Sequence, residues 1–252
     1  MKRLTFIALL LVCGLTSAET WTNHKGLTLV ATSWQVVQVN PKLTTIKSKG
    51  NVLVTSVPDG VTISSEQLDF ESIPNPKRPK TNLLSHASAT TNVKIVKTVT
   101  APSGTQTTEV LGPRADYLAG SIEGIVKIIG PTTIKNYDKA QAQSMTATGS
   151  SGIAYLDPGV RVASGSGLRH ATLQGPVKVI FQQTATKTEA ASTITATAST
   201  MQIQNVGNQE IITLIGSVHI LGPGDSEASG VNRAVMVHEP GRGWRLDASG
   251  GK

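Results

Sequence analysis

The sequence predicts an all-β fold. In several stretches apolar residues alternate with other residues, which is the period of a strand that buries one face. Thr, Ser, Val, Ile and Gly dominate the 252-residue chain, and Val, Ile and Thr favour strands. No amphipathic helix of convincing length is found along the chain. Because all-β domains of this size commonly stay single, we expect one domain over 19–240.

Four of the alternating stretches set a glycine on the apolar face of the strand. In the clearest one, 212–220, the alternation places Gly216 on the same face as Leu214 and Val218. One unit repeated along the chain is therefore expected, although its irregular spacing argues against a solenoid of fixed period. The other three glycines of this kind are Gly50, Gly124 and Gly175.

Each unit is expected to be a hairpin whose second strand carries the glycine. The strand 31–36 leads through the turn Asn40-Pro41 to Gly50, and turn-forming Asn and Pro between alternating runs are typical of hairpins. The same order of elements is found upstream of the other glycines, at 198–203 with a turn at 205–208, at 115–117 and at 154–155.

Prolines, glycines and local composition predict the remaining loops, turns and strands. Three prolines within 73–80 exclude a central strand, so we expect a basic loop or a boundary there, at 74–80. The turn 101–104 joins two expected strands, 93–99 and 105–111. The Thr- and Ala-rich run 184–200 is expected to form a hairpin crest that leads into a strand at 194–203. Glycines after Pro240 predict a flexible tail, 241–252, with Trp244 able to hold its start.

The N-terminal residues predict export. Lys2 and Arg3 precede an apolar run, 4–15, and Thr16-Ser17-Ala18 suits cleavage after Ala18, so 1–18 is expected to be a signal peptide. An uncleaved anchor in the inner membrane and lipidation at Cys13 are the alternatives. Cleavage would remove the single cysteine, so stability is expected to come from burial and sheet hydrogen bonds rather than a disulfide.

The chain is basic, with a net charge of +7 and a pI of about 9.6. Loss of Lys2 and Arg3 with the signal would lower the charge to about +5. Anionic partners such as lipid head groups or phosphorylated glycolipids are favoured, whereas export argues against nucleic acid. Alternatively, the lysines only keep the sheet soluble, because four of them are expected to face away from the apolar side: Lys47, Lys49, Lys127 and Lys178.

No sequence signature of an enzyme is found. The nucleophile elbow, the phosphate-binding glycine loop and the zinc-protease motif are absent, and five histidines are scattered without metal-ligand spacing. We therefore expect no catalytic residue, no metal and no cofactor. Two distant carboxylates that meet in the fold would be the remaining route to catalysis.

The repeated unit resembles the periplasmic lipopolysaccharide-transport family, that is, the LptA or OstA-like (organic solvent tolerance-like) domain. Its pattern is a small residue, an aromatic or apolar residue, a turn, and a strand that ends in Gly-Asn-Val. Ala31, Trp34, Gly50, Asn51 and Val52 match this pattern. A second copy, with Ser in place of Asn, consists of Ala198, Met201, Gly216, Ser217 and Val218, and looser copies begin at Ala115 and Ala154.

This resemblance implies an open, V-shaped β-jellyroll (a β-taco) whose interior holds acyl chains of lipopolysaccharide or a similar anionic glycolipid. It also implies stacking of sheet edges, head to tail with further copies or with other OstA-like domains, in a bridge between inner and outer membranes. An uncleaved N-terminus would fit an LptC-like relative. Pro176, at the Asn position of its repeat, and the longer strands at 93–111 depart from the pattern.

The alternation and the resemblance together give a set of candidate binding residues on the glycine-bearing face. The expected lipid-binding groove consists of Ile46, Val52, Val54, Val126, Ile128, Leu173, Val177, Val179, Leu214, Val218 and Ile220. The expected edge strands for partners contain Leu27 and Leu29, and Val235 and Val237. The rival hypothesis is a structural or adhesive cell-surface β-protein in which the same residues form a closed core, with each glycine at a bulge or bend.

Overall fold

The computed structural model confirms the all-β prediction. It describes residues 19–23, 27–40, 43–56, 61–74, 82–101, 104–119, 124–138, 142–156, 168–185, 190–206, 209–239 and 243–247. The expected signal peptide, 1–18, lies outside these residues. Within these ranges the chain forms one antiparallel sheet of sixteen strands and a single short 3₁₀ turn, Pro223–Asp225. None of the described residues belongs to a helix with the length and apolarity needed to span a bilayer.

Most of the sheet follows the chain order from one hairpin to the next. The strands are β1 Glu19–Asn23, β2 Leu27–Ala31, β3 Ser33–Asn40, β4 Leu43–Ser56, β5 Val61–Pro74, β6 Asn82–Ala101, β7 Gly104–Ala119, β8 Gly124–Ile129, β9 Thr132–Asp138, β10 Gln143–Gly149, β11 Ser151–Leu156, β12 Leu168–Gln183, β13 Ser192–Val206, β14 Gln209–Leu221, β15 Glu227–Glu239 and β16 Gly243–Asp247. The expected hairpins at β3–β4, β7–β8, β11–β12 and β13–β14 are confirmed by their pairing.

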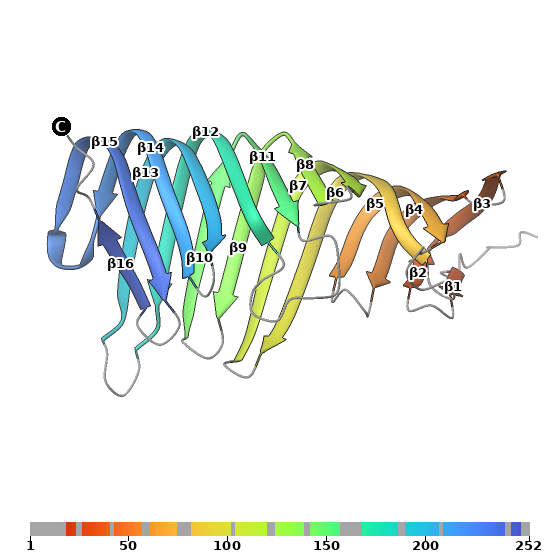
Figure 1. Cartoon of the computed structure of the whole chain (residues 1–252), viewed down its shortest axis with the longest axis horizontal. Coiled ribbons are helices and arrows are strands. Elements are labelled where there is room, and N and C mark those ends of the chain that lie inside the picture. The colour runs from red at the N-terminus through yellow and green to blue at the C-terminus, as the bar shows by residue number, and fades with distance from the viewer. Residues whose placement is uncertain are drawn as a thin grey trace, which may run out of the picture.

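The sheet is folded lengthwise into two layers, because nearly every long strand bends near its middle (Figure 1). Layer A contains 33–40, 43–49, 67–74, 82–90, 114–119, 124–129, 151–156, 168–174, 200–206, 209–215, 233–239 and 243–247. Layer B contains 19–23, 27–31, 52–56, 61–65, 93–101, 104–112, 132–138, 143–149, 177–183, 192–198, 218–221 and 227–231. This folded sheet is consistent with an open β-jellyroll.

The bends form a row of corners along the fold, and two kinds alternate from strand to strand. A wide corner leaves two residues out of the ladder, and a narrow corner leaves out one. The wide corners are Gly50-Asn51, Thr91-Asn92, Gly130-Pro131, Gly175-Pro176 and Gly216-Ser217. The narrow corners are Thr32, Glu66, Pro113, Ser150, Ser199 and Asn232.

The two corners affect the alternation of side chains differently. Two inserted residues keep the strand in phase, so Leu214 and Val218 are both buried on either side of Gly216. One inserted residue shifts the phase by one, so buried Ala198 is followed across Ser199 by buried Met201. Both arms of each strand therefore present their apolar residues to the space between the layers.

Glycine at a wide corner is required for two reasons. Gly216 has φ +78°, a left-handed conformation that L-residues rarely adopt. A Cβ placed there would also lie 2.8 Å from Oγ of Ser199 at the neighbouring narrow corner. The β7–β8 unit differs from the other three, because its corner follows β8 at Gly130. Gly124 instead lies at the start of that strand, against the ring of Tyr117.

The expected turn between two strands near 101–104 is confirmed by the β6–β7 pairing, and the strand expected at 194–203 lies within β13. Residues 75–80 of the proline-rich loop lie outside the described residues. Pro74 pairs with Asn82 on either side of them, so the sheet continues across this point. The expectation of a flexible tail is wrong for Gly243–Asp247, which forms β16 on β15.

The two expected edge strands lie inside the sheet. Leu27 and Leu29 pair with β1 on one side and with β4 on the other, and Val235 and Val237 lie between β14 and β16. The expectation that these residues offer free sheet edges is therefore wrong. The strands 19–23 and 243–247 pair there and occupy both expected edges. Leu29 is fully buried, and Val235 and Val237 are half-buried.

Candidate functional site

All eleven residues expected to line a groove face the space between the layers and belong to one apolar core. Their exposure is 0–5%, with Val54 and Val126 the most exposed. The structure thus brings together the residues that sequence alternation selected, but as a closed core over most of its length. Accessible apolar surface on the inner face must therefore come from other residues.

One row of inner side chains crosses layer B from β5 to β14 and shows where the interior is accessible. Cross-strand pairing connects its members, Ile63, Ile95, Val110, Ile134, Ala147, Val179, Ala196 and Ile220. Ile95 and Val110 are half-buried, whereas Ala147, Val179 and Ala196 are fully buried. The row is therefore partly exposed at β6 and β7 and closed from β10 onward.

The arms beside this exposed part of the row differ in length. In layer B, the arms 93–101 and 104–112 are each nine residues long, whereas the layer A arms 114–119 and 124–129 have six. Three residues of strand correspond to about 10 Å. The lower parts of the long β6 and β7 arms therefore extend past these shorter arms, as the long strands near the middle of Figure 1 show.

The next inner row, towards the hairpin loops, is mostly polar. Val61, Lys97, Thr108 and Asn136 are paired in succession across β5, β6, β7 and β9. All four are half-buried. We use the name "mouth" for the accessible inner surface made of Val61, Ile95, Lys97, Thr108, Val110 and Asn136. It is amphipathic, with its apolar side towards the corners and its polar side towards the loops.

A hydrogen bond crosses the interior at the polar side of the mouth. Nδ2 of Asn136 in layer B donates to Oε2 of Glu210 in layer A over 3.0 Å, and Glu210 is only 6% exposed. Gln143, on the inner face of β10, is 5% exposed. Oδ1 of Asn136 and Oε1 of Gln143 are buried and have no hydrogen-bond partner within the protein.

The N-terminal end of the inner face is also accessible. Trp34 of β3 packs on the core as a half-buried side chain, and Val36, two residues further on the same face, is 43% exposed. Trp34 was selected from the sequence only as a motif residue. The mouth residues were missed, although Lys97 stands in phase with Ile95, and this alternation was the available signal.

The outer face opposite the mouth carries an ion-pair cluster. Nζ of Lys94 lies 2.8 Å from Oε2 of Glu109, and Nζ of Lys135 lies 3.4 Å from Oε1 of the same carboxylate. The hydrogen bond from Lys94 is the main cause that lowers the pKa of Glu109, against a smaller opposing effect of burial. The cluster connects the long arms of β6 and β7 to β9.

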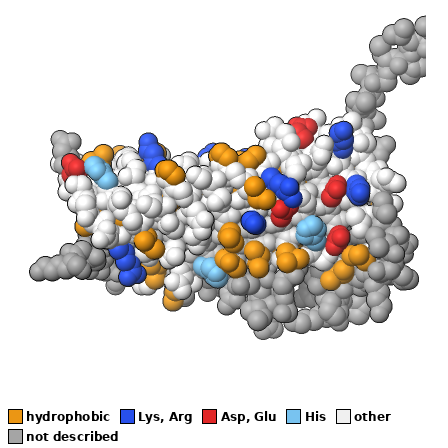
Figure 2. Space-filling model, turned by 90° about the horizontal axis from the view of Figure 1, so that it is seen from above, with side chains coloured by type: hydrophobic (Ala, Val, Ile, Leu, Met, Phe, Trp, Pro, Cys, Tyr) orange, Lys and Arg blue, Asp and Glu red, His pale blue; other side chains and the backbone are white. Residues whose placement is uncertain are grey.

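The four lysines expected to point away from the apolar face, Lys47, Lys49, Lys127 and Lys178, are exposed. Figure 2, which looks down on the molecule from above Figure 1, shows acidic and basic side chains gathered mainly over the N-terminal side. The C-terminal side of this face is largely uncharged. The outer surface therefore differs from the apolar interior in the way that the alternation predicts.

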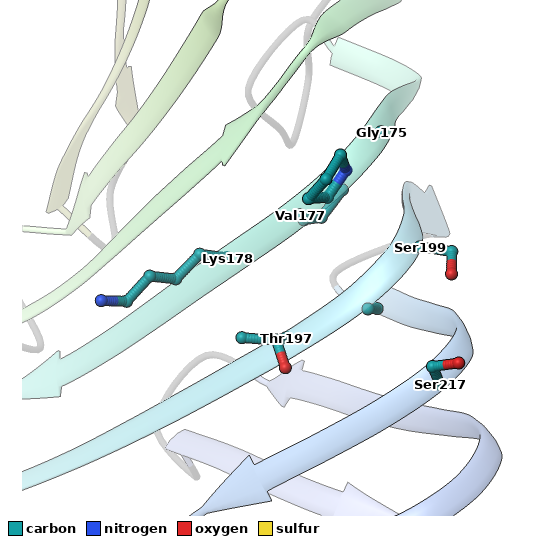
Figure 3. Close-up of a pocket in the computed structure, with 8 residues that line it drawn as sticks. Gly175, Val177, Lys178, Thr197, Ser199 and Ser217 are labelled. Carbon is teal, nitrogen blue, oxygen red and sulfur yellow. The ribbon is translucent and has the colours of Figure 1, made fainter.

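One open hollow of about 510 Å³ lies outside the corners of β12, β13 and β14 (Figure 3). Gly175, Thr197, Ser199 and Ser217 contribute to its lining, and Lys178 extends beside it. Its polar groups are exposed hydroxyls on a shallow surface. These features give it no group of buried, convergent side chains of the kind that forms a binding site.

The described residues include no group of three or more His, Cys, Asp or Glu side chains arranged to hold a metal ion. Comparisons with known proteins give no further direction, since no family, no curated protein and no solved structure matches this chain. The amphipathic mouth and the apolar core behind it are thus the features on which a function can be argued.

Proposed function

We propose that this protein is a non-enzymatic lipid carrier that holds acyl chains between the two layers of its folded sheet. The observation that carries the proposal is the half-buried pair Ile95 and Val110, which joins the accessible mouth to a core of the same apolar character. A chain that enters there would be shielded from water, and each buried methylene contributes about 0.8 kcal/mol.

The architecture supports uptake without a permanent cavity. The layers are continuous at the corners, and at the mouth a hydrogen bond from Asn136 to Glu210 joins them. Separation of the layers beside this bond, with the bond intact, would extend the accessible surface from Val110 towards Ile134 and Met145, which lie on the neighbouring inner positions. The narrow and wide corners would remain as the fixed fold line.

The chemistry of the ligand follows from charge and from the resemblance. A basic chain favours an anionic amphipath, and lipopolysaccharide or a similar anionic glycolipid is the cargo of the family that the repeats resemble. With a signal peptide at 1–18, the carrier would work in the periplasm, between inner and outer membranes. Retention of this segment would place it on the inner membrane, facing the periplasm.

Partner domains would join the sheet at its ends. Among the described strands, β3 pairs only with β4, β1 only with β2, and β16 only with β15. Such edges offer backbone donors and acceptors for strand addition. A head-to-tail oligomer, or a bridge with other OstA-like domains, would use these terminal strands rather than the inner ones first expected.

A structural or adhesive β-protein is the second candidate, and a specific observation favours it. The eleven predicted groove residues are 0–5% exposed in one continuous core. Such burial is what a closed sandwich needs for stability, with no ligand required. The two hypotheses differ in whether the inner face of β7 meets a lipid.

Photo-crosslinking from matched neighbours distinguishes them. A photoreactive residue at Val110, on the inner face, should label a radiolabelled glycolipid several-fold more than one at Leu111, on the outer face of the same strand. Val177 should likewise exceed Lys178, because a bound chain would extend into the deep core. Equal labelling at Val110 and Leu111 would contradict the carrier and support the closed β-protein.

A further inference from the structure

We infer that the polar side of the mouth is a binding site for the hydroxyl groups of an amphipathic ligand, with Asn136 and Gln143 as its hydrogen-bond acceptors. This inference rests on the proposed function, because it places the polar end of the carried molecule. It adds a chemical selectivity that an apolar trough alone does not have.

Strand register puts the polar and apolar parts of this site next to each other. Thr108 pairs with Asn136, and Val110 pairs with Ile134 one step closer to the corners. Directly paired side chains on one face lie about 5 Å apart. A chain that rests on Val110 and Ile134 therefore has its polar end beside Thr108 and Asn136.

The amide of Asn136 is oriented by its partner in the other layer. A carboxylate only accepts hydrogen bonds, so the nitrogen of Asn136 must face Glu210. Oδ1 then points elsewhere, and it is buried with no partner within the protein. This oxygen is thus held as an acceptor by a contact that spans both layers.

Gln143 supplies a second acceptor. It lies on the same inner face, diagonal to Asn136, because β10 pairs Gln143 with Asp138 and Met145 with Asn136. The side chain is 95% buried, since its exposure is 5%, and Oε1 has no partner within the protein. An unpaired buried acceptor costs stability, so this position is poorly explained by folding alone.

Two oxygen acceptors select for ligand groups that donate. Hydroxyls and amide N–H groups meet this requirement, whereas an ester or ether oxygen does not. A site built around acceptors discriminates against an analogue that lacks the donor, because its own buried groups then stay unpaired. The ligand class is therefore an amphipath with hydroxyl groups directly next to its acyl chain.

The test uses two lipids with the same oleoyl chain and different polar ends. Monoolein carries two hydroxyl donors, and methyl oleate carries none. Each competes with the fluorescent probe 11-(dansylamino)undecanoic acid for the full-length protein. We expect monoolein to displace the probe at a concentration about fivefold lower than methyl oleate, the factor that one hydrogen bond supplies.

Gln143→Met is the decisive variant, because methionine keeps the approximate shape and removes the buried acceptor. It should fold with equal or higher thermal stability, bind methyl oleate unchanged and lose the preference for monoolein. Gln182→Met, at an exposed position of β12, is the matched control and should keep the preference.

The outcomes separate the two proposals. If the native protein binds both lipids equally, or if Gln143→Met keeps the monoolein preference, the hydroxyl site is wrong while the carrier stands. If neither lipid displaces the probe, the carrier itself is wrong and the hydroxyl site is rejected with it.

Discussion

The same transverse row of the sheet is accessible at β6 and β7 and closed at β10 to β14. Val110 and Val179 are the same residue type on the same row and face, yet Val110 is half-buried and Val179 is fully buried. Residue type therefore does not decide exposure on this row, and the packing against each residue does.

The comparison also separates two roles for one apolar pattern. In the closed half the side chains pack on each other and stabilise the fold. At β6 and β7 the equivalent side chains, Ile95 and Val110, are half-buried, and the polar residues Lys97, Thr108 and Asn136 follow on the adjoining row. A surface of this kind, apolar on one side and polar on the other, suits an amphipathic ligand.

A substitution at a wide corner of the closed part of the sheet should lower the free energy of unfolding the most. Gly216→Val forces a β-branched residue into φ +78° and places Cβ against Ser199, so the free energy of unfolding should fall by about 3 kcal/mol. Urea denaturation followed by circular dichroism measures this.

Gly230→Val is the matched control for that corner, since Gly230 has φ +75° with nothing within 4 Å of its Cβ position. It should cost only about 1–2 kcal/mol, the strain of the left-handed conformation. Equal losses in both variants would show that close contact between corners contributes nothing.

The pair of valines tests the comparison itself. Val179→Ala should lower the free energy of unfolding by about 2–3 kcal/mol, because it removes two methyl groups and leaves a cavity in a closed core. Val110→Ala should cost about 1 kcal/mol, because that side chain is already partly solvated. Urea unfolding of both variants gives the values, and similar losses would mean that the mouth is as closed as the rest.

The smallest expected effect concerns the ion pairs behind the mouth. The folded state lowers the pKa of Glu109 through Lys94, so ionised Glu109 stabilises the fold above its unfolded pKa. This stabilisation is lost as the pH falls below about 4.5 and through the lowered pKa. Glu109→Gln should therefore cost less than about 1 kcal/mol at pH 7.

The two proteins should converge in stability at the acidic end of a pH series of thermal melts, and 0.5 M salt should shrink their difference at pH 7. A difference that grew on acidification would contradict the sign of this linkage. A null result at all pH values would mean that the cluster does not help to hold the long arms of β6, β7 and β9 together.

The sequence predicted much of the fold because wide corners leave the alternation intact. The apolar face continues through Gly50, Gly175 and Gly216, so the pattern could be followed across each bend. Narrow corners shift the alternation by one residue, and none was recognised. The wide corner Thr91-Asn92 was not recognised either, because its first residue has φ +64° although it is not a glycine.

Side-chain orientation was thus determined by the sequence, because it depends on local alternation and on residues that tolerate a left-handed backbone. All eleven candidate residues face inward for that reason. Whether an inward residue is buried or accessible depends on strands far away in the chain. Only the tertiary structure decided that Ile95 and Val110 are half-buried, that Asn136 meets Glu210, and that the expected edges are occupied by β1 and β16. Coverage depends on which side chains of distant strands pack against a residue, and no local pattern contains that information.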